Sequence, residues 1–428
     1  MIDAICPIPW NHAGIQQNGD YRICCQNIHH PFGKLSIDGD TANIKNCEFN
    51  EARNLPEIVE LRKDMVNGVQ NKLCSMCYDE EKSGLPSKRL HMLRDYGIPD
   101  TSTMVDGKID TSIHPIKYID IRFGNLCNLK CRYCGPADSS LWLEEYADSM
   151  HEEVVPMWFY GNNQYKITKN SHNKWQLNTD DFEWHDSELF WDNFVKIMPH
   201  IDRYYFTGGE PLINKSHMRM LELIVKHGHA SKIVIEYNSN MVAVPPKMYE
   251  IWANFKYIKM GCSIDGIGEM ANYLRYPSEW SIIEHNLETM SASTSCNIDA
   301  SISTTISAFN VLHFLDLTKF FMIKNYRRIK QVPSFHVLHG PSYMSIQVLP
   351  MKTKLEIKKA YLEFYEYVRQ HHPVIYHKVK SSYDGILNFM FADDKSHLLP
   401  KLKSSIESMD KYRGQDITNS VPWLAKIL

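Results

Sequence analysis

Three cysteines, Cys127, Cys131 and Cys134, stand close together in the spacing Cys-x3-Cys-x2-Cys. Three thiolates on one short loop can hold three irons of a 4Fe–4S cluster, and no fourth cysteine lies nearby. A cluster held by four cysteines is coordinatively saturated and suits electron transfer. A cluster held by three keeps one iron open, which a small molecule can chelate. The spacing therefore predicts a cluster that acts on a bound ligand.

Polar segments further along the chain carry groups that could hold such a ligand. Residues 208–210 are Gly-Gly-Glu, in which the glycines let backbone approach a ligand and the carboxylate can accept hydrogen bonds from an ammonium group. Ser239 stands in an Asn-Ser-Asn segment suited to ribose hydroxyls, and Ser263 with Arg275 could pair a carboxylate. Each signal alone is weak, because a tight turn or a surface salt bridge explains it. Their coincidence favours one ligand with an amine, a ribose and a carboxylate.

The elements that must position these groups are strands alternating with helices. The predicted strands are the apolar, β-branched segments 118–123, 203–206, 232–237, 257–264, 298–306 and 343–349. Segments with helical periodicity, such as 216–225 and 310–323, separate most of them. Six such strands predict a parallel sheet built from βα units. Sites in these folds gather at the C-terminal ends of the strands, where the three cysteines and the polar segments stand.

Composition is that of an ordinary globular protein. The chain of 428 residues is 43% hydrophobic and 23% charged, which suffices for two or three domains. A net charge of −3 argues against a polyanionic nucleic-acid substrate. We find neither an apolar run long enough for a membrane span nor a signal-peptide pattern, and therefore expect no membrane association and a cytoplasmic location. Eleven cysteines in short-spaced groups favour metal binding over disulfides.

The cysteine loop and the strand-end segments together resemble the radical SAM superfamily across residues 117–350. The resemblance implies a partial (β/α)6 barrel and an enzyme, an oxidoreductase or a related class, that uses S-adenosylmethionine (SAM) and a catalytic 4Fe–4S cluster. It implies that SAM is cleaved reductively to methionine and a 5′-deoxyadenosyl radical, which abstracts hydrogen from a substrate. The implied cluster ligands are Cys127, Cys131 and Cys134; the implied SAM contacts are Tyr133 at the adenosine, Gly208, Gly209 and Glu210 at the amine, Ser239 at the ribose, and Ser263 with Arg275 at the carboxylate.

The N-terminal cysteines resemble the twitch or SPASM modules of the same superfamily. Cys6 and Cys24 are spaced like the start of such a module, and Cys74 with Cys77 like a shortened finish. The resemblance implies that these four hold an auxiliary 4Fe–4S cluster. The module follows the barrel in well-known members, whereas here it precedes the barrel.

Alternatives stay open for this N-terminal site. Either Cys25 or Cys47 could replace one of the four ligands, although adjacent Cys24 and Cys25 are poorly placed to bind the same metal. A zinc site with four cysteine ligands requires the same thiolates and a similar Cys-x2-Cys knuckle.

The expected organisation has four parts: 1–85, an auxiliary iron–sulfur domain; 86–116, a linker; 117–350, the barrel; and 351–428, a helical region. Within the barrel, segment 138–200 is an aromatic-rich insertion, which is either a subdomain with its own core or a lid over the site.

The substrate expected from the resemblance is a peptide or protein side chain. A nucleotide or carbohydrate-like small molecule is the alternative, and a non-catalytic iron–sulfur or zinc binding protein is a third. A radical SAM enzyme also requires a reducing partner, such as a flavodoxin- or ferredoxin-like electron donor.

Overall fold

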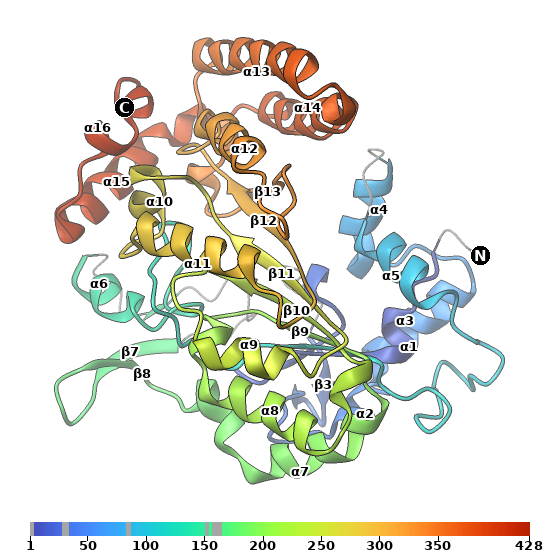
Figure 1. The fold of residues 1–428 in the computed structure, drawn as a ribbon. Coiled ribbons are helices and arrows are strands. Elements are labelled where there is room, and N and C mark those ends of the chain that lie inside the picture. The colour runs from blue at the N-terminus through green and yellow to red at the C-terminus, as the bar shows by residue number, and fades with distance from the viewer. Residues whose placement is uncertain (1–3, 28–33, 83–86, 150–153, 156–164) are drawn as a thin grey trace.

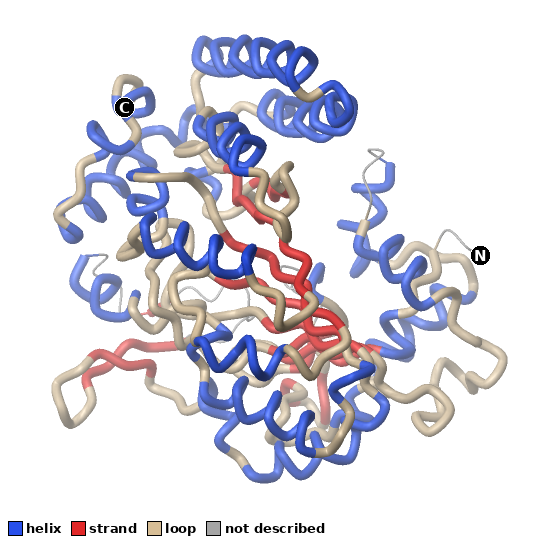
Figure 2. Tube along the Cα trace, viewed as in Figure 1, coloured by secondary structure: helices blue, strands red, loops and turns tan. Residues whose placement is uncertain are grey.

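The computed structural model, drawn in Figure 1, describes residues 4–27, 34–82, 87–149, 154–155 and 165–428. Its centre is an eight-stranded sheet with the order β13-β12-β11-β10-β9-β5-β1-β2. The strands are β1 His12–Ile15, β2 Tyr21–Arg22, β5 Tyr118–Ile121, β9 Arg203–Phe206, β10 Val234–Ser239, β11 Tyr257–Ser263, β12 Ile298–Ile306 and β13 Ser334–Val337. All neighbouring strands pair in parallel except β1 with β2. Helices surround this sheet in Figure 2, so the predicted α/β class with a central parallel sheet is confirmed.

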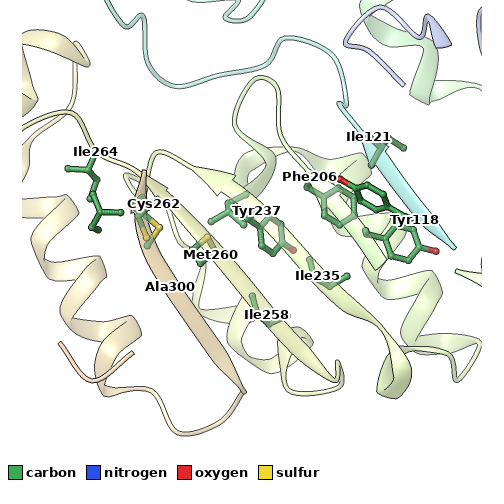
Figure 3. Packing of buried hydrophobic residues seen from close by; sticks show 14 of the residues in the cluster. Tyr118, Ile121, Phe206, Ile235, Tyr237, Ile258, Met260, Cys262, Ile264 and Ala300 are labelled. Atoms are coloured by element: carbon green, nitrogen blue, oxygen red, sulfur yellow. The ribbon is translucent and has the colours of Figure 1, made fainter. Parts of the chain in front are cut away.

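One face of the sheet is apolar and packs against helices. Phe206, Tyr237, Met260 and Ala300 are paired neighbours across four strands, and all are buried (Figure 3). The helices near this face are α7 Glu188–Ile197, α8 Lys215–Lys226, α9 Pro246–Trp252, α10 Glu269–Leu274, α11 Trp280–Ala292 and α12 His313–Lys324. Ring contacts join α7, α8 and α9 to β9 and β10.

The opposite face of the sheet is polar. Successive side chains of a strand point to opposite faces, so Asp120, Tyr205, Glu236, Asn238 and Lys259 share this second face. Two hydrogen bonds join pairs of these side chains, from Asn238 Nδ2 to Tyr205 Oη (2.8 Å) and from Lys259 Nζ to Glu236 (2.9 Å). This face therefore carries hydrogen-bonding groups rather than a hydrophobic core.

The N-terminal region extends the central sheet. Strand β1 pairs in parallel with β5, with His12 opposite Tyr118 and Ile15 opposite Ile121. The other elements of this region are α1 Ile8–Asn11, β3 Ser36–Ile37, β4 Asp40–Thr41, α2 Phe49–Ala52, α3 Pro56–Val66 and α4 Ser75–Lys82. Residues 1–85 were expected to form a domain of their own, but the pairing of β1 with β5 joins them to the sheet of the expected barrel.

The predicted linker 86–116 contains a helix, α5 Lys88–Tyr96. This helix lies on the polar face of the sheet, where Lys88 Nζ donates to the Tyr118 hydroxyl (3.3 Å) and Arg203 pairs with Asp95 (2.8 Å). Ser87 caps the helix by accepting a hydrogen bond from the backbone of Leu90, a start signal within a segment that otherwise resembles a loop.

The insertion 138–200 contains α6 Trp142–Ser149, β6 Val154–Val155, β7 Tyr165–Lys169, β8 Trp175–Leu177 and α7. Trp184 and Trp191 stack on Phe123 at the end of β5, with ring centroids 5.6 and 6.4 Å apart. These two aromatic residues therefore form core, while residues 158–160 of the insertion lie outside the described residues.

The prediction of a sixth strand at 343–349 is wrong. Ser342–Met344 and Ile346–Val348 form short 3₁₀ helices instead, and the strand that completes the parallel run is β13. Most of the run is buried, and a short buried apolar run has no periodicity that separates strand from helix.

The C-terminal region is helical, with α13 Met351–His371, α14 Tyr376–Ala392, α15 Leu399–Arg413, α16 Ile417–Ser420 and α17 Pro422–Ala425. Figure 1 shows α15 and α16 at the same end of the sheet as α6 and α10. None of the helices in the described ranges is both long and apolar enough to cross a membrane.

Candidate functional site

The loop that carries Cys127, Cys131 and Cys134 follows β5 at the C-terminal edge of the sheet. Its backbone is held by hydrogen bonds from Glu210 N to Leu126 O (2.8 Å), from Lys130 N to Tyr276 O (2.7 Å) and from Arg132 N to Leu274 O (2.9 Å). Trp142 Nε1 also donates to the carbonyl of Cys131 (3.1 Å). The loop is thus fixed by the turns after β9 and α10 and by α6.

The three thiols of this loop differ in their surroundings. Cys131 is buried, Cys127 is half-buried and Cys134 is exposed. The interaction between the neighbouring Cys131 and Cys134 side chains lowers the pKa of Cys131 and raises the pKa of Cys134. Burial raises the pKa of Cys127 to about 12. Metal ligation requires the thiolate forms, and three soft thiolates are the donor set that iron–sulfur clusters use.

The Gly-Gly-Glu turn after β9 packs directly against the cysteine loop. Gly208 and Gly209 have φ values of 73° and 53°, in the left-handed region that favours glycine. A Cβ added to Gly209 would lie 2.4 Å from the carbonyl oxygen of Leu126. Glycine at this position therefore allows the hydrogen bond between Glu210 and Leu126 that joins the two segments.

Replacing Gly209 with alanine should disturb the cysteine loop as well as the turn. The left-handed backbone alone costs about 1–2 kcal/mol for a residue with a Cβ, and the clash with Leu126 adds to this. We expect lower iron loading after reconstitution, measured as iron per chain. Gly228→Ala is the matched control, because φ there is also positive (74°) but the added Cβ meets nothing within 4 Å. Equal iron loading in the two variants would contradict the prediction.

Glu210 and Ser239 are brought together at the ends of β9 and β10. The carboxylate is buried; Oε1 accepts from Ser239 Oγ (2.9 Å) and Leu212 N (3.1 Å), and Oε2 accepts from Asn240 N (2.7 Å). Burial raises the pKa of Glu210 to about 7. The Ser239 hydroxyl, predicted to face a ribose, here donates to Glu210, and the pair ties two neighbouring strand ends together.

Arg275 lies between the cysteine loop and the end of β11. Its Nε donates to Asp265 Oδ2 (2.5 Å), and its Nη1 donates to the sulfur of Cys131 (3.8 Å). Ser263 is half-buried at the end of β11, opposite Ser303 of β12. The roles of Arg275 and Ser263 toward a SAM carboxylate stay predictions.

Tyr133 lies within the cysteine loop and packs partly against the core. Its hydroxyl is buried and has no hydrogen-bond partner among the residues that the structure describes. The predicted contact of Tyr133 with adenosine is an expectation that no contact here tests.

Two buried ion pairs at this site are formed by residues that belong to no recognisable sequence motif. Arg132, within the cysteine loop, pairs with Asp410 of α15, which also accepts from the Tyr273 hydroxyl (3.2 Å). Arg413 of α15 pairs with Glu145 of α6 (2.8 Å). These partners are more than 250 positions apart in the chain, so spacing could not reveal them; the only signal is charge in otherwise ordinary helices.

The 3₁₀ helices Cys25–Asn27 and Lys72–Cys74 both contact α4, which brings the segments that carry Cys24, Cys74 and Cys77 together. Burial raises the pKa of Cys6, and the neighbouring Cys74 and Cys77 raise it further. Burial likewise raises the pKa of Cys24, with Cys25, Cys74 and Cys77 adding to the effect. The structure thus brings Cys6, Cys24, Cys74 and Cys77 together.

The two spare cysteines differ in position. Cys25 lies within electrostatic range of Cys77 and also of Asp120 on β5. The described interactions of Cys47 are with Tyr21, Glu48 and Glu51 rather than with the cysteine group. Cys25 is therefore the better placed alternative ligand.

Across the described ranges, no three His, Cys, Asp or Glu side chains surround a single metal-ion position. The two groups nonetheless each bring several cysteines together beside a basic side chain, Arg275 at one and Arg89 at the other. Both donor sets fit a thiolate-ligated iron–sulfur cluster.

Comparison with protein-family models gives no match, and comparison with curated proteins gives none either. Among solved structures, the protein described as native anSMEcpe with bound AdoMet is 17% identical, with a TM-score of 0.37. The likeness covers 59% of this chain and 61% of that one, so it spans less than two thirds of the neighbour.

SuiB from Streptococcus suis, solved with bound S-adenosylmethionine, is 14% identical over 74% of this chain and 64% of its own, with a TM-score of 0.35. SuiB bound to the precursor peptide SuiA is 13% identical over 77% and 66%, with a TM-score of 0.34. These likenesses are partial and distant, and what this chain does must be inferred from its own residues.

Proposed function

We propose that this protein is a radical SAM enzyme with a catalytic 4Fe–4S cluster held by Cys127, Cys131 and Cys134. The observation that carries the proposal is the meeting of three features at one edge of the sheet. They are the three-cysteine loop after β5, the Gly-Gly-Glu turn after β9, and the polar ends of β10 and β11. These features would suit SAM. An open iron of the cluster would chelate it, the backbone turn would bind its amine, and the arginine would pair with its carboxylate.

When bound, the cluster would supply the electron that cleaves SAM to methionine and a 5′-deoxyadenosyl radical. The chain's own residues hold and orient the reactants. Arg275, fixed by Asp265, places a positive charge beside Cys131. The left-handed turn at Gly208 and Gly209 would offer backbone groups to the methionine amine. The Glu210 carboxylate fixes this turn to the end of β10, because it accepts hydrogen bonds from Ser239 and Asn240.

The fold we propose for the catalytic part is a partial (β/α)6 barrel. Its support is the unbroken parallel run from β5 through β9, β10, β11 and β12 to β13. The polar face of that run would then line the interior, next to the strand ends that carry the cysteine loop.

The second metal site we propose is an auxiliary 4Fe–4S cluster held by Cys6, Cys24, Cys74 and Cys77. Its support is their mutual proximity at the junction of three short helices. The substrate we propose is a peptide or protein side chain bound against the polar face, with an external flavodoxin- or ferredoxin-like protein as electron donor.

The test is anaerobic reconstitution with iron and sulfide, followed by iron counting and an assay for 5′-deoxyadenosine with dithionite and SAM. Two clusters require about eight irons per chain, and SAM cleavage would establish the catalytic one. About four irons with cleavage would assign the N-terminal cysteines to zinc or to structure. A loaded cluster without SAM binding or cleavage, with and without candidate peptides, would favour a binding protein instead.

A further inference from the structure

Helix α15 reaches the cysteine loop from the C-terminal side of the chain. It packs on α6, whose first residue, Trp142, donates a hydrogen bond to the carbonyl of Cys131. At the end of α15, Arg413 lies over the ring of Trp142, with its guanidinium carbon 4.6 Å from the ring centroid, and beside Tyr276 at 5.4 Å. Arg413 therefore belongs to the packing directly behind the cysteine loop.

The guanidinium of Arg413 is only partly satisfied there. Its Nε donates to both oxygens of Glu145, at 2.8 and 3.1 Å, and neither side chain is exposed to solvent. Nη1 and Nη2 are buried and have no hydrogen-bond partner within the described part of the chain. Buried guanidinium nitrogens are costly to leave unpaired, so these two nitrogens indicate a missing acceptor.

The charges around the loop are also unequal. Arg132 pairs with Asp410, and Arg275 pairs with Asp265. Arg413, however, shares Glu145 with Lys130, whose Nζ lies 2.8 Å from the carboxylate. Two cations therefore share one buried carboxylate, which leaves positive charge beside the loop. A buried cation needs an anionic partner.

The partner that fits is the set of three thiolates that would hold a cluster at Cys127, Cys131 and Cys134. Arg413 lies over the ring of Trp142, and Trp142 Nε1 donates to the carbonyl of Cys131, so this buried charge lies directly behind Cys131. Three thiolates give the site a net negative charge, and one-electron reduction increases it. A nearby buried cation stabilises the more negative state.

We propose that Arg413 is a positioning residue whose buried positive charge, behind Cys131, makes the catalytic cluster easier to reduce. The inference rests on the proposed function, because it requires a cluster at Cys127, Cys131 and Cys134. It adds a residue from the far C-terminal helix to the control of that cluster.

The experiment is a redox titration of the reconstituted full-length protein with dithionite, followed by electron paramagnetic resonance. The catalytic cluster is identified as the signal that changes when SAM is added. In Arg413→Gln, Glu145 keeps Lys130 as its partner, so the fold should survive. We expect the ratio of reduced to oxidised cluster at a fixed potential to fall at least about tenfold, which is 59 mV for a one-electron couple.

Two further variants isolate the cause. Arg413→Lys keeps the charge and should stay close to the wild-type potential. Lys411→Gln removes an exposed positive charge from the same helix and should leave the potential unchanged. An unchanged potential in Arg413→Gln, or equal shifts in Arg413→Gln and Arg413→Lys, would overturn the inference.

Loading of the cluster gives a second readout. If Arg413→Gln does not take up the SAM-responsive cluster, restored loading in Arg413→Lys supports the role of the charge, and failure of both variants contradicts it. A wild-type protein without any SAM-responsive signal would instead refute the proposed function and the inference with it.

Discussion

Cys131→Ala should abolish the reductive cleavage of SAM. Cys131 is the buried member of the three-cysteine loop, and its sulfur accepts a hydrogen bond from Arg275 Nη1. Loss of a residue that only supports a metal ligand already lowers affinity or activity by about 10–100-fold. Loss of a ligand should therefore reduce 5′-deoxyadenosine formation by at least about a hundredfold. The measurement is the rate of 5′-deoxyadenosine release with dithionite under strictly anaerobic conditions.

The control for this variant is Cys296→Ala. Cys296 is also buried, but it lies beyond α11, where its sulfur is 3.9 Å from the Ser293 hydroxyl. This variant should cleave SAM at the wild-type rate. If Cys131→Ala also does so, the assignment of the catalytic cluster is wrong.

Cys74→Ala should separate the two proposed clusters. Cys74 lies beside Cys77, and burial raises the pKa of Cys74 to about 12. Without this ligand the N-terminal group retains three thiolates, and iron should fall from about eight to about four per chain. SAM cleavage should persist at a reduced rate, because the cysteine loop after β5 is unchanged, but product formation from substrate should stop.

Cys47→Ala is the matched control for Cys74→Ala. Cys47 belongs to the same N-terminal region but interacts with Tyr21, Glu48 and Glu51. Its replacement should leave about eight irons in place. An unchanged iron content in Cys74→Ala would exclude an iron–sulfur cluster at this site, and loss of one zinc instead would assign it to zinc.

The regular strands were predictable because their periodicity is local. The predicted strands 203–206 and 298–306 coincide with β9 and β12. Strand β1 was not predicted, because a strand of four residues, His-Ala-Gly-Ile, shows no clear alternation. It becomes a strand only by pairing with β5, about a hundred residues later, and such pairing leaves no trace in a short window of sequence.

Some parts of the candidate site could likewise be predicted from the sequence, and others could not. The spacing of Cys127, Cys131 and Cys134 and the glycines of the turn are local patterns with a chemical meaning, and they could be found. The pairs of Arg132 with Asp410 and Arg413 with Glu145 could not, because a charged residue on a helix is most simply explained as part of its solvated face. Only the three-dimensional structure shows that these charges are buried behind the cysteine loop.

The parallel pairing of β1 with β5 makes the N-terminal region a part of the central sheet. Strand β5 would be an open edge without β1, with a row of unpaired backbone groups that invites aggregation. Instead β1 covers it, and the short antiparallel β2 takes the edge position. The N-terminal cysteine region therefore cannot be detached as a modular appendage: its loss would expose the strand that leads into the cysteine loop.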